Sequence, residues 1–235
     1  MFSDNVLRSG LASKITYLHP GHRALNQYKS KYGLEKQITL FGSNHTNAKA
    51  DVWEAGPKSS IVAFRGSTSV QNAKQVLKAD LDEFHFRQFH GRIHTGVMDV
   101  FQNLVGDIDT QVIGKRNVLF TGHSLGGALA LLAAVYYASM MPACNVACHT
   151  FGAPRIGDSN FRAWSERVVP EAIHVCNIND LVCRLPIYGE AYVENYGRHL
   201  WIGEGHGNLV ANHDMDEYLL DMLREIQTQR MDIRR

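Results

Sequence analysis

A serine between two glycines offers the clearest chemistry in this chain. Ser124 is the centre of GHSLG (residues 122–126), which follows an apolar run ending at Thr121 and precedes another beginning at Leu125. A G-x-S-x-G pattern between a strand and a helix is typical of a tight turn that exposes a nucleophilic hydroxyl. Free N–H groups at the start of the helix favour a developing negative charge. Ser124 is therefore the predicted nucleophile, the alternative being a glycine-rich turn that contains a serine by chance.

A nucleophilic serine needs a base and an acid that orients the base, and in this arrangement the acid and then the base follow the serine along the chain. Asp180 comes soon after the apolar run 173–178, and His213 directly precedes a C-terminal helical pattern. A side chain at either point can reach the sheet edge where the serine is expected. We therefore predict Asp180 as the acid and His213 as the base.

Other acids and histidines leave alternatives. Asp158 stands where a helix begins, which capping explains without catalysis. His206 lies between two glycines and is the second choice for the base, while His199 lies in a strand-like run. His123 is too close to Ser124 in sequence to act as its base, so we expect it to pack near the site.

The loop after the apolar run 61–64 supplies a candidate for binding the oxyanion of an acyl-transfer reaction. It reads RGSTS (65–69), where Ser67 offers both an N–H and a hydroxyl. The N–H of Leu125 is the second predicted donor because this residue follows the nucleophile. On this segment alone, a plain polar turn is the better interpretation of Ser67. Residues 69–80 follow with an amphipathic pattern, which we interpret as a lid or, alternatively, as an ordinary surface helix.

Strand-like and helix-like segments alternate along the chain. Strands are predicted at 37–42, 50–55, 60–64, 118–121, 146–151, 173–178 and 192–202, and helices at 11–32, 97–113, 125–140, 159–169 and 214–229. This alternation predicts an α/β fold with a mostly parallel central sheet and helices on both faces. The length suits a single domain over residues 1–235, with the site beyond the carboxyl ends of the strands.

Composition narrows the function classes. A formal net charge of +1 gives no field that favours nucleic acid or an anionic membrane, and no apolar run is long enough to span a bilayer. The first twelve residues have neither a basic nor a continuous apolar region, so we expect no secretory signal and a cytoplasmic location. The four cysteines form no CxxC pair, so we expect reduced thiols, with no metal site and no cofactor.

Six stretches together resemble the class 3 lipase family, the α/β-hydrolases that include fungal triacylglycerol lipases. They are AFRGSTS (63–69), HTGVMDVF (94–101), FTGHSLGGALALL (120–132), TFGAPRIGDSNF (150–161), NINDLVCRLP (177–186) and NHDMDEYL (212–219). The resemblance implies that Ser124 is the nucleophile, Asp180 the acid and His213 the base. It also implies that Ser67 and the Leu125 N–H bind the oxyanion, and that a lid covers residues near 69–80.

The resemblance further implies a serine hydrolase that cleaves lipid carboxylic esters: a triacylglycerol or partial-glyceride lipase with no cofactor and with a lid that contacts the lipid surface transiently. Ala73 stands where the fungal lid carries a tryptophan, so phospholipid acyl esters and short soluble esters are also expected substrates. Phospholipase A1 or short-chain carboxylesterase activity is the alternative. Serine peptidase or thioesterase chemistry would use the same residues. A catalytically silent α/β-hydrolase scaffold that binds a partner or a lipid is the non-enzymatic alternative.

Overall fold

The computed structural model describes residues 3–18, 30, 33–42, 48–67, 81–83, 90–186, 192–204 and 211–232. The predicted lid at 69–80 lies outside these residues, and so does His206, the second choice for the base. Of the helix predicted at 11–32, the part after residue 18 lies almost wholly outside them too.

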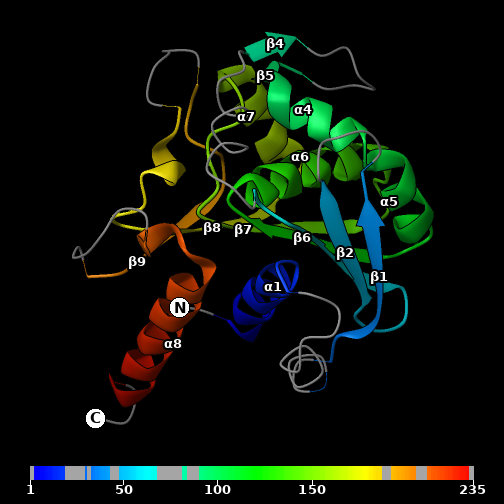
Figure 1. Cartoon of the computed structure of the whole chain (residues 1–235). Coiled ribbons are helices and arrows are strands. Elements are labelled where there is room, and N and C mark those ends of the chain that lie inside the picture. The colour runs from blue at the N-terminus through cyan, green and yellow to red at the C-terminus, as the bar shows by residue number, and fades with distance from the viewer. Residues whose placement is uncertain are drawn as a thin grey trace.

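The described strands build one large sheet in the order β1-β2-β3-β6-β7-β8-β9 (Figure 1). These strands are β1 (Glu35–Phe41), β2 (Lys49–Glu54), β3 (Ser59–Phe64), β6 (Asn117–His123), β7 (Asn145–Phe151), β8 (Glu171–Asn177) and β9 (Arg198–Ile202). Strands β3, β6, β7, β8 and β9 run parallel, while β1 and β2 pair antiparallel to their neighbours. The mostly parallel sheet predicted from the sequence is confirmed.

Helices cover both faces of this sheet (Figure 1). On one face lie α1 (Asp4–Ile15) and α8 (Met215–Asp232), and on the other α4 (Thr95–Gln102), α5 (Val105–Val112), α6 (Leu125–Met140) and α7 (Ser159–Val168). Two short 3₁₀ helices, η1 (Val182–Arg184) and η2 (Ala211–His213), lie in the connections before and after β9. A small second sheet pairs β4 (Leu81–Glu83) with β5 (Arg92–His94).

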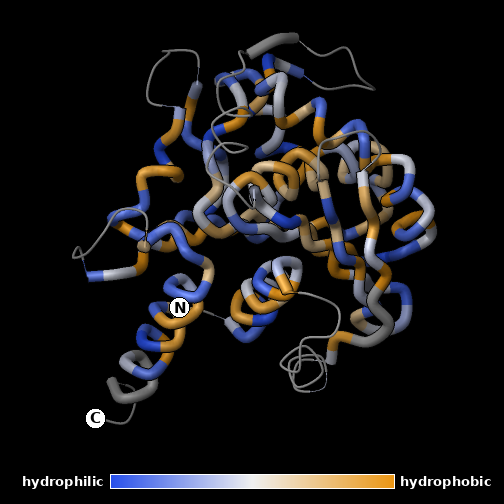
Figure 2. The backbone as a smooth tube through the Cα atoms, in the orientation of Figure 1, coloured by the Kyte–Doolittle hydropathy of each residue, from blue (hydrophilic) through white to orange (hydrophobic). Residues whose placement is uncertain are grey.

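Alternate residues of the central strand β6 face the helices on opposite sides of the sheet, as in any strand that is buried on both faces. Val118 and Phe120 belong to the core that contains α6, whereas Leu119 packs against the smaller core under α1. Helix α6 is buried over most of its length and is apolar on every side, which places it between the sheet and α4 (Figure 2). None of the helices in the described ranges combines enough length and apolar character to cross a bilayer.

Three local predictions differ from the structure. Helix α1 begins at Asp4 rather than at residue 11, because the Ser3 hydroxyl accepts from the Val6 N–H and caps it. The helix predicted at 97–113 is broken into α4 and α5, and a tighter turn in which the Leu104 N–H donates to the Phe101 carbonyl marks the break. Strand β9 covers only the last five residues of the strand predicted at 192–202.

Candidate active site

The turn from β6 to α6 holds Ser124 in a conformation that ordinary residues rarely adopt. Its φ is +58° and its ψ is −130°, a strained combination for a residue with a side chain. The Ser124 N–H donates to the Phe151 carbonyl at 2.9 Å, which ties the turn to the end of β7. A Cβ at Gly122 would overlap the Gly126 carbonyl, and one at Gly126 would overlap the Phe64 carbonyl. Both glycines of the motif are therefore required by close backbone approach.

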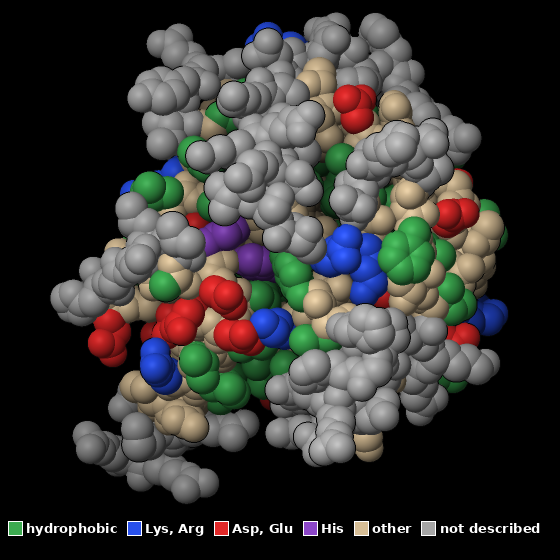
Figure 3. All heavy atoms as spheres, in the orientation of Figure 1, with side chains coloured by type: hydrophobic (Ala, Val, Ile, Leu, Met, Phe, Trp, Pro, Cys, Tyr) green, Lys and Arg blue, Asp and Glu red, His purple; other side chains and the backbone are tan. Residues whose placement is uncertain are grey.

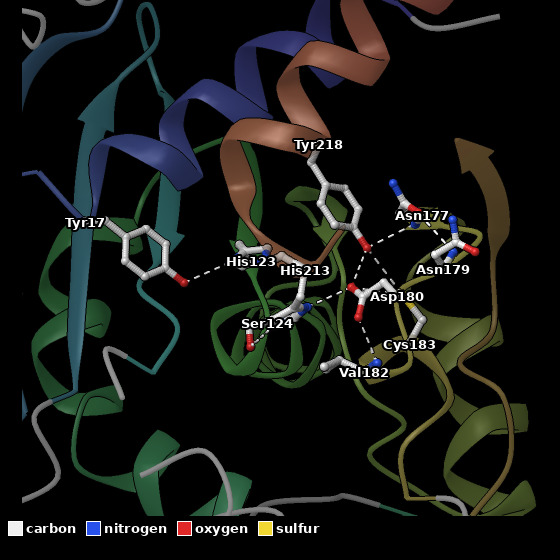
Figure 4. A network of polar contacts seen from close by, with 10 residues as sticks. All are labelled: Tyr17, His123, Ser124, Asn177, Asn179, Asp180, Val182, Cys183, His213 and Tyr218. Atoms are coloured by element: carbon white, nitrogen blue, oxygen red, sulfur yellow. Dashed lines mark hydrogen bonds and ion pairs between the residues drawn. The ribbon is translucent and has the colours of Figure 1, made fainter. Parts of the chain in front are cut away.

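Ser124, His213 and Asp180 meet although they lie far apart in sequence (Figure 4). The Ser124 Oγ is 2.8 Å from the His213 Nε2, and the His213 Nδ1 is 2.7 Å from the Asp180 Oδ2. Ser124 follows β6, Asp180 follows β8, and His213 ends η2 just before α8. The carboxyl ends of the parallel strands thus bring a hydroxyl, an imidazole and a carboxyl into one line.

The Asp180 carboxyl is buried and surrounded by donors. The Tyr218 hydroxyl donates to its Oδ2 at 2.7 Å, and the Val182 N–H donates to its Oδ1 at 2.8 Å. An ionised carboxylate only accepts, so the His213 Nδ1 must donate to it. The His213 Nε2 is then left to accept from the Ser124 hydroxyl, which is the tautomer that a general base requires.

Tyr218 is a site residue that was not among those predicted from the sequence. It projects from the first turn of α8, is fully buried, and also accepts from the Asn177 N–H at 3.0 Å. Burial raises the pKa of Tyr218, so the phenol keeps the proton that it donates to Asp180. A tyrosine five residues after a candidate base, on the buried face of a helix, is the signal that could have identified it.

Gly152 has no side chain, which leaves space for Asp180 and His213 to contact each other. It follows β7 with a φ of +58°, and its N–H donates to the Val175 carbonyl at 3.0 Å. A Cβ at this position would lie 2.8 Å from the Asp180 Oδ2 and 3.2 Å from the His213 Nδ1. Glycine is therefore required here by both backbone conformation and space.

The two predicted oxyanion residues, Ser67 and Leu125, lie next to Ser124. The loop after β3 approaches so closely that a Cβ at Gly66 would lie 3.1 Å from the Ser124 Cβ. Within the described part of the chain, the buried Ser67 hydroxyl has no hydrogen-bond partner, and Ser67 and Ser124 line the same pocket. Leu125 is the first residue of α6, where N–H groups lack helical acceptors. Both residues can supply donors beside the serine.

A pocket of about 260 Å³ opens next to Ser124, and its lining combines polar and apolar surface. It is lined by Lys14, Tyr17, Ser67, His123, Ser124, His213, Asp214 and Met215. Histidine side chains reach the surface on this face of the molecule, next to a group of acidic side chains (Figure 3). The Lys14 Nζ pairs with the Asp216 Oδ2 at 2.6 Å, so the cation at the pocket wall is already neutralised.

His123 contacts the site through its ring, as expected from its position beside Ser124. Its Nε2 is 2.7 Å from the His213 carbonyl oxygen, and its Nδ1 is 2.9 Å from the Tyr17 hydroxyl (Figure 4). Burial, with a smaller effect from His213, lowers the pKa of His123 to about 3. Tyr17 comes from the turn after α1, and no local motif in the sequence marks it.

The alternative acid, Asp158, and one alternative base, His199, each have a structural role. Asp158 caps α7, where its Oδ1 accepts from the Phe161 N–H at 2.9 Å. His199 stacks between His174 and Trp201 on β9. In the ranges that the structure covers, no group of three or more His, Cys, Asp or Glu side chains is arranged to hold a metal ion.

The mostly parallel sheet, the serine turn between β6 and α6 and the line of three side chains define an α/β-hydrolase. The family model described as lipase (class 3) matches residues 61–189, which is more than half of the chain. The chain therefore belongs to the class 3 lipase family.

Individual relatives agree with this assignment. A secreted mono- and diacylglycerol lipase of Malassezia globosa is 27% identical over 198 residues, covering 77% of this chain and 64% of that protein. Protein EDS1L of Arabidopsis thaliana is 32% identical over 204 residues, covering 81% of this chain and 30% of that protein. The chain thus spans less than two thirds of the length of both relatives.

Solved structures share the fold. The crystal structure of a lipase from Rhizopus microsporus var. chinensis superposes with a TM-score of 0.72 at 22% sequence identity. The match covers 88% of this chain and 77% of that chain. At this identity the likeness supports the α/β-hydrolase architecture, which the sequence predicted and which is confirmed.

Proposed function

We propose that this chain is a serine hydrolase that cleaves carboxylic esters of lipids through a covalent acyl-enzyme. The observation that carries the proposal is the continuous line from the Ser124 Oγ through His213 to the Asp180 Oδ2, with separations of 2.8 Å and 2.7 Å. Nucleophile, base and orienting acid within hydrogen-bond reach form the arrangement that activates a serine hydroxyl. Membership of the class 3 lipase family supports an ester as the substrate.

In the proposed first half-reaction, the Ser124 Oγ attacks the ester carbonyl carbon while the His213 Nε2 takes the hydroxyl proton. The Asp180 carboxylate holds the His213 Nδ1–H and stabilises the imidazolium that forms. The Leu125 N–H and the Ser67 hydroxyl bind the oxyanion, and losing one such donor typically costs about 3 kcal/mol of barrier. The carbon–oxygen bond to the alcohol then breaks, and the alcohol leaves with the proton from His213.

In the second half-reaction, water takes the place of the alcohol. His213 accepts a proton from the water as its oxygen attacks the acyl carbon, and then returns a proton to the Ser124 Oγ as the free acid is released. Every proton in the cycle moves between the substrate, water, Ser124 and His213.

For the substrate we propose partial glycerides, that is mono- and diacylglycerols, in preference to triacylglycerol. Asp214 lines the pocket beside Ser124, and free glycerol hydroxyls can hydrogen-bond to its carboxyl. The Malassezia relative, named as a mono- and diacylglycerol lipase, supports this choice. Transient contact with a lipid surface belongs to the same proposal.

Labelling with a fluorophosphonate, which reacts covalently with an activated serine, tests the mechanism. We expect the wild-type chain to be labelled at Ser124, and Ser124→Ala to lose both the label and ester turnover, by at least about 10³-fold. Far-ultraviolet circular dichroism of Ser124→Ala serves as the folding control. An unlabelled, folded wild-type chain would instead support a silent scaffold.

A substrate panel tests the finer proposal. Monoolein, diolein, triolein and phosphatidylcholine are compared as emulsions, beside short- and long-chain p-nitrophenyl esters. We expect the largest kcat/KM on monoolein or diolein. Faster cleavage of triolein would overturn the preference for partial glycerides, and would leave the assignment of Ser124 intact.

A further inference from the structure

Two side chains behind the candidate base form a hydrogen-bonded pair that the reaction scheme does not use. The Tyr17 hydroxyl is 2.9 Å from the His123 Nδ1, and the His123 Nε2 is 2.7 Å from the backbone oxygen of His213 (Figure 4). We infer that Tyr17 and His123 are positioning residues, in which Tyr17 orients the His123 ring and the ring anchors the backbone of His213. This inference rests on the proposed function, because it assigns His213 the role of base.

The tautomer follows from the partners of the two ring nitrogens. A backbone carbonyl can only accept, so the His123 Nε2 must carry the proton that it shares with the His213 oxygen. In a neutral imidazole the other nitrogen is then an acceptor, so the Tyr17 hydroxyl must donate to the His123 Nδ1. Tyr17 therefore satisfies the second ring nitrogen and holds the ring in the plane in which its Nε2–H points at the His213 oxygen.

The His213 carbonyl is open to this contact because of where it lies. The first turn of α8 uses the next carbonyl instead, since the Tyr218 N–H donates to the Asp214 oxygen at 3.2 Å. The His213 ring is held by Ser124 and Asp180, while its main chain is held by His123. The ring and the backbone of the candidate base are thus fixed from independent directions.

The loop after β3 is shaped around the Tyr17 hydroxyl. A Cβ at Gly66 would overlap this oxygen, so the glycine before the predicted oxyanion residue Ser67 makes room for it. Burial raises the pKa of Tyr17, against a smaller lowering by the Gly66 backbone. Tyr17 therefore keeps the proton that it donates to His123.

The pair keeps a neutral ring beside a base that must become charged. The His123 and His213 ring centroids are 4.7 Å apart. A second positive charge at that distance would oppose protonation of His213 during attack by Ser124. With Tyr17 donating to its Nδ1, His123 holds the His213 backbone without adding such a charge.

The first test removes one oxygen atom with Tyr17→Phe. Without the Tyr17 donor, the buried His123 Nδ1 loses its partner, and the ring is no longer held in the plane that points its Nε2–H at the His213 carbonyl. We expect kcat on a soluble p-nitrophenyl ester and the rate of fluorophosphonate labelling to fall about tenfold, with KM changed less than twofold. Tyr137→Phe is the matched control, because it also loses a buried hydroxyl, bonded to Asp109 at 2.8 Å, away from the site. We expect it to leave both rates unchanged.

The second test asks whether Tyr17 acts through His123. In His123→Gln, the side-chain amide can donate to the His213 carbonyl whatever its other neighbours are. Adding Tyr17→Phe to this variant should therefore change kcat less than twofold. An equal tenfold loss in both backgrounds would overturn the inference.

Nuclear magnetic resonance gives a direct readout that does not depend on activity. In ¹⁵N-histidine-labelled protein, we expect the His123 Nε2–H of the wild type to exchange slowly with solvent, and that of Tyr17→Phe to exchange at least about tenfold faster. Unchanged exchange of the His123 Nε2–H, or a wild-type kcat in Tyr17→Phe, would refute the inference even if His123→Gln failed to fold. A wild-type chain that fluorophosphonate does not label would instead refute the proposed function, before any variant is compared.

Discussion

Gly152→Ala tests whether the geometry of the acid and base matters as the structure implies. The added methyl group would lie 2.8 Å from the Asp180 Oδ2, 3.0 Å from the Tyr218 hydroxyl and 3.2 Å from the His213 Nδ1. The shortest of these is roughly half an ångström or more inside ordinary contact, so at least one partner must move. Because a displacement of about 1 Å can cost about 10²-fold in rate, we expect kcat to fall about 10- to 100-fold.

Backbone strain must be separated from this effect, because alanine at a φ of +58° is itself unfavourable by about 1–2 kcal/mol. Gly114→Ala is the matched control, since Gly114 has a φ of +81° and no neighbouring atom within 4 Å of an added Cβ. Urea unfolding should show a loss of stability in both variants, and a larger one in Gly152→Ala because its methyl group also displaces buried neighbours. Assays on a soluble p-nitrophenyl ester should show a loss of kcat only in Gly152→Ala. A kcat in Gly152→Ala that matches Gly114→Ala would refute the assigned roles of Asp180 and His213.

Two further predictions concern stability. Asp158→Ala removes the cap of α7, so we expect a loss of about 1 kcal/mol in urea unfolding with kcat unchanged, and a large loss of kcat would instead restore Asp158 as a candidate acid. Burial lowers the pKa of His149 to about 4 and that of His174 to about 3, so the unfolded chain binds more protons than the folded chain between about pH 4 and 6.5. The free energy of unfolding should therefore fall as the pH drops through this window, by on the order of 1 kcal/mol per histidine per pH unit. Unfolding titrations at pH 7.5, 6 and 5 check this, and a flat profile would contradict it.

The sequence predicted Ser124, Asp180 and His213 because each lies at a position that a local sequence pattern marks. Ser124 lies in a motif that links a strand to a helix, and Asp180 lies shortly after an apolar strand. His213 stands just before the last helical pattern. The carboxyl ends of parallel strands lie at the same edge of the sheet, so residues that follow different strands in the sequence come close together in the fold. The bounds of α6 were predictable for a related reason, since the apolar run and the turn before it are unambiguous.

Tyr17, Tyr218 and Gly152 could not be assigned in the same way. Tyr17 reaches His123 only after α1 packs on β6, a contact across 106 residues that no short motif encodes. Tyr218 reads as one more apolar position of α8 until its hydroxyl is seen on Asp180. Gly152 is one glycine among 20, and only its φ and its neighbours separate it from the rest. These roles depend on tertiary packing rather than on local pattern.

Helices α1 and α8, the first and last helices among the described residues, both contribute side chains or neighbouring residues to the site. Tyr17 extends from α1, and Tyr218 projects from α8, whose first turn directly follows the base. These two helices contact one another and are bridged by Lys14 and Asp216. Detachment of α8 alone would leave the five parallel strands paired while carrying away the imidazole and the phenol that supports its acid. We therefore expect fluorophosphonate labelling of Ser124 to report whether this last helix is docked, because local opening of α8 would separate His213 and Tyr218 from Ser124 and Asp180 while the rest of the fold stays intact.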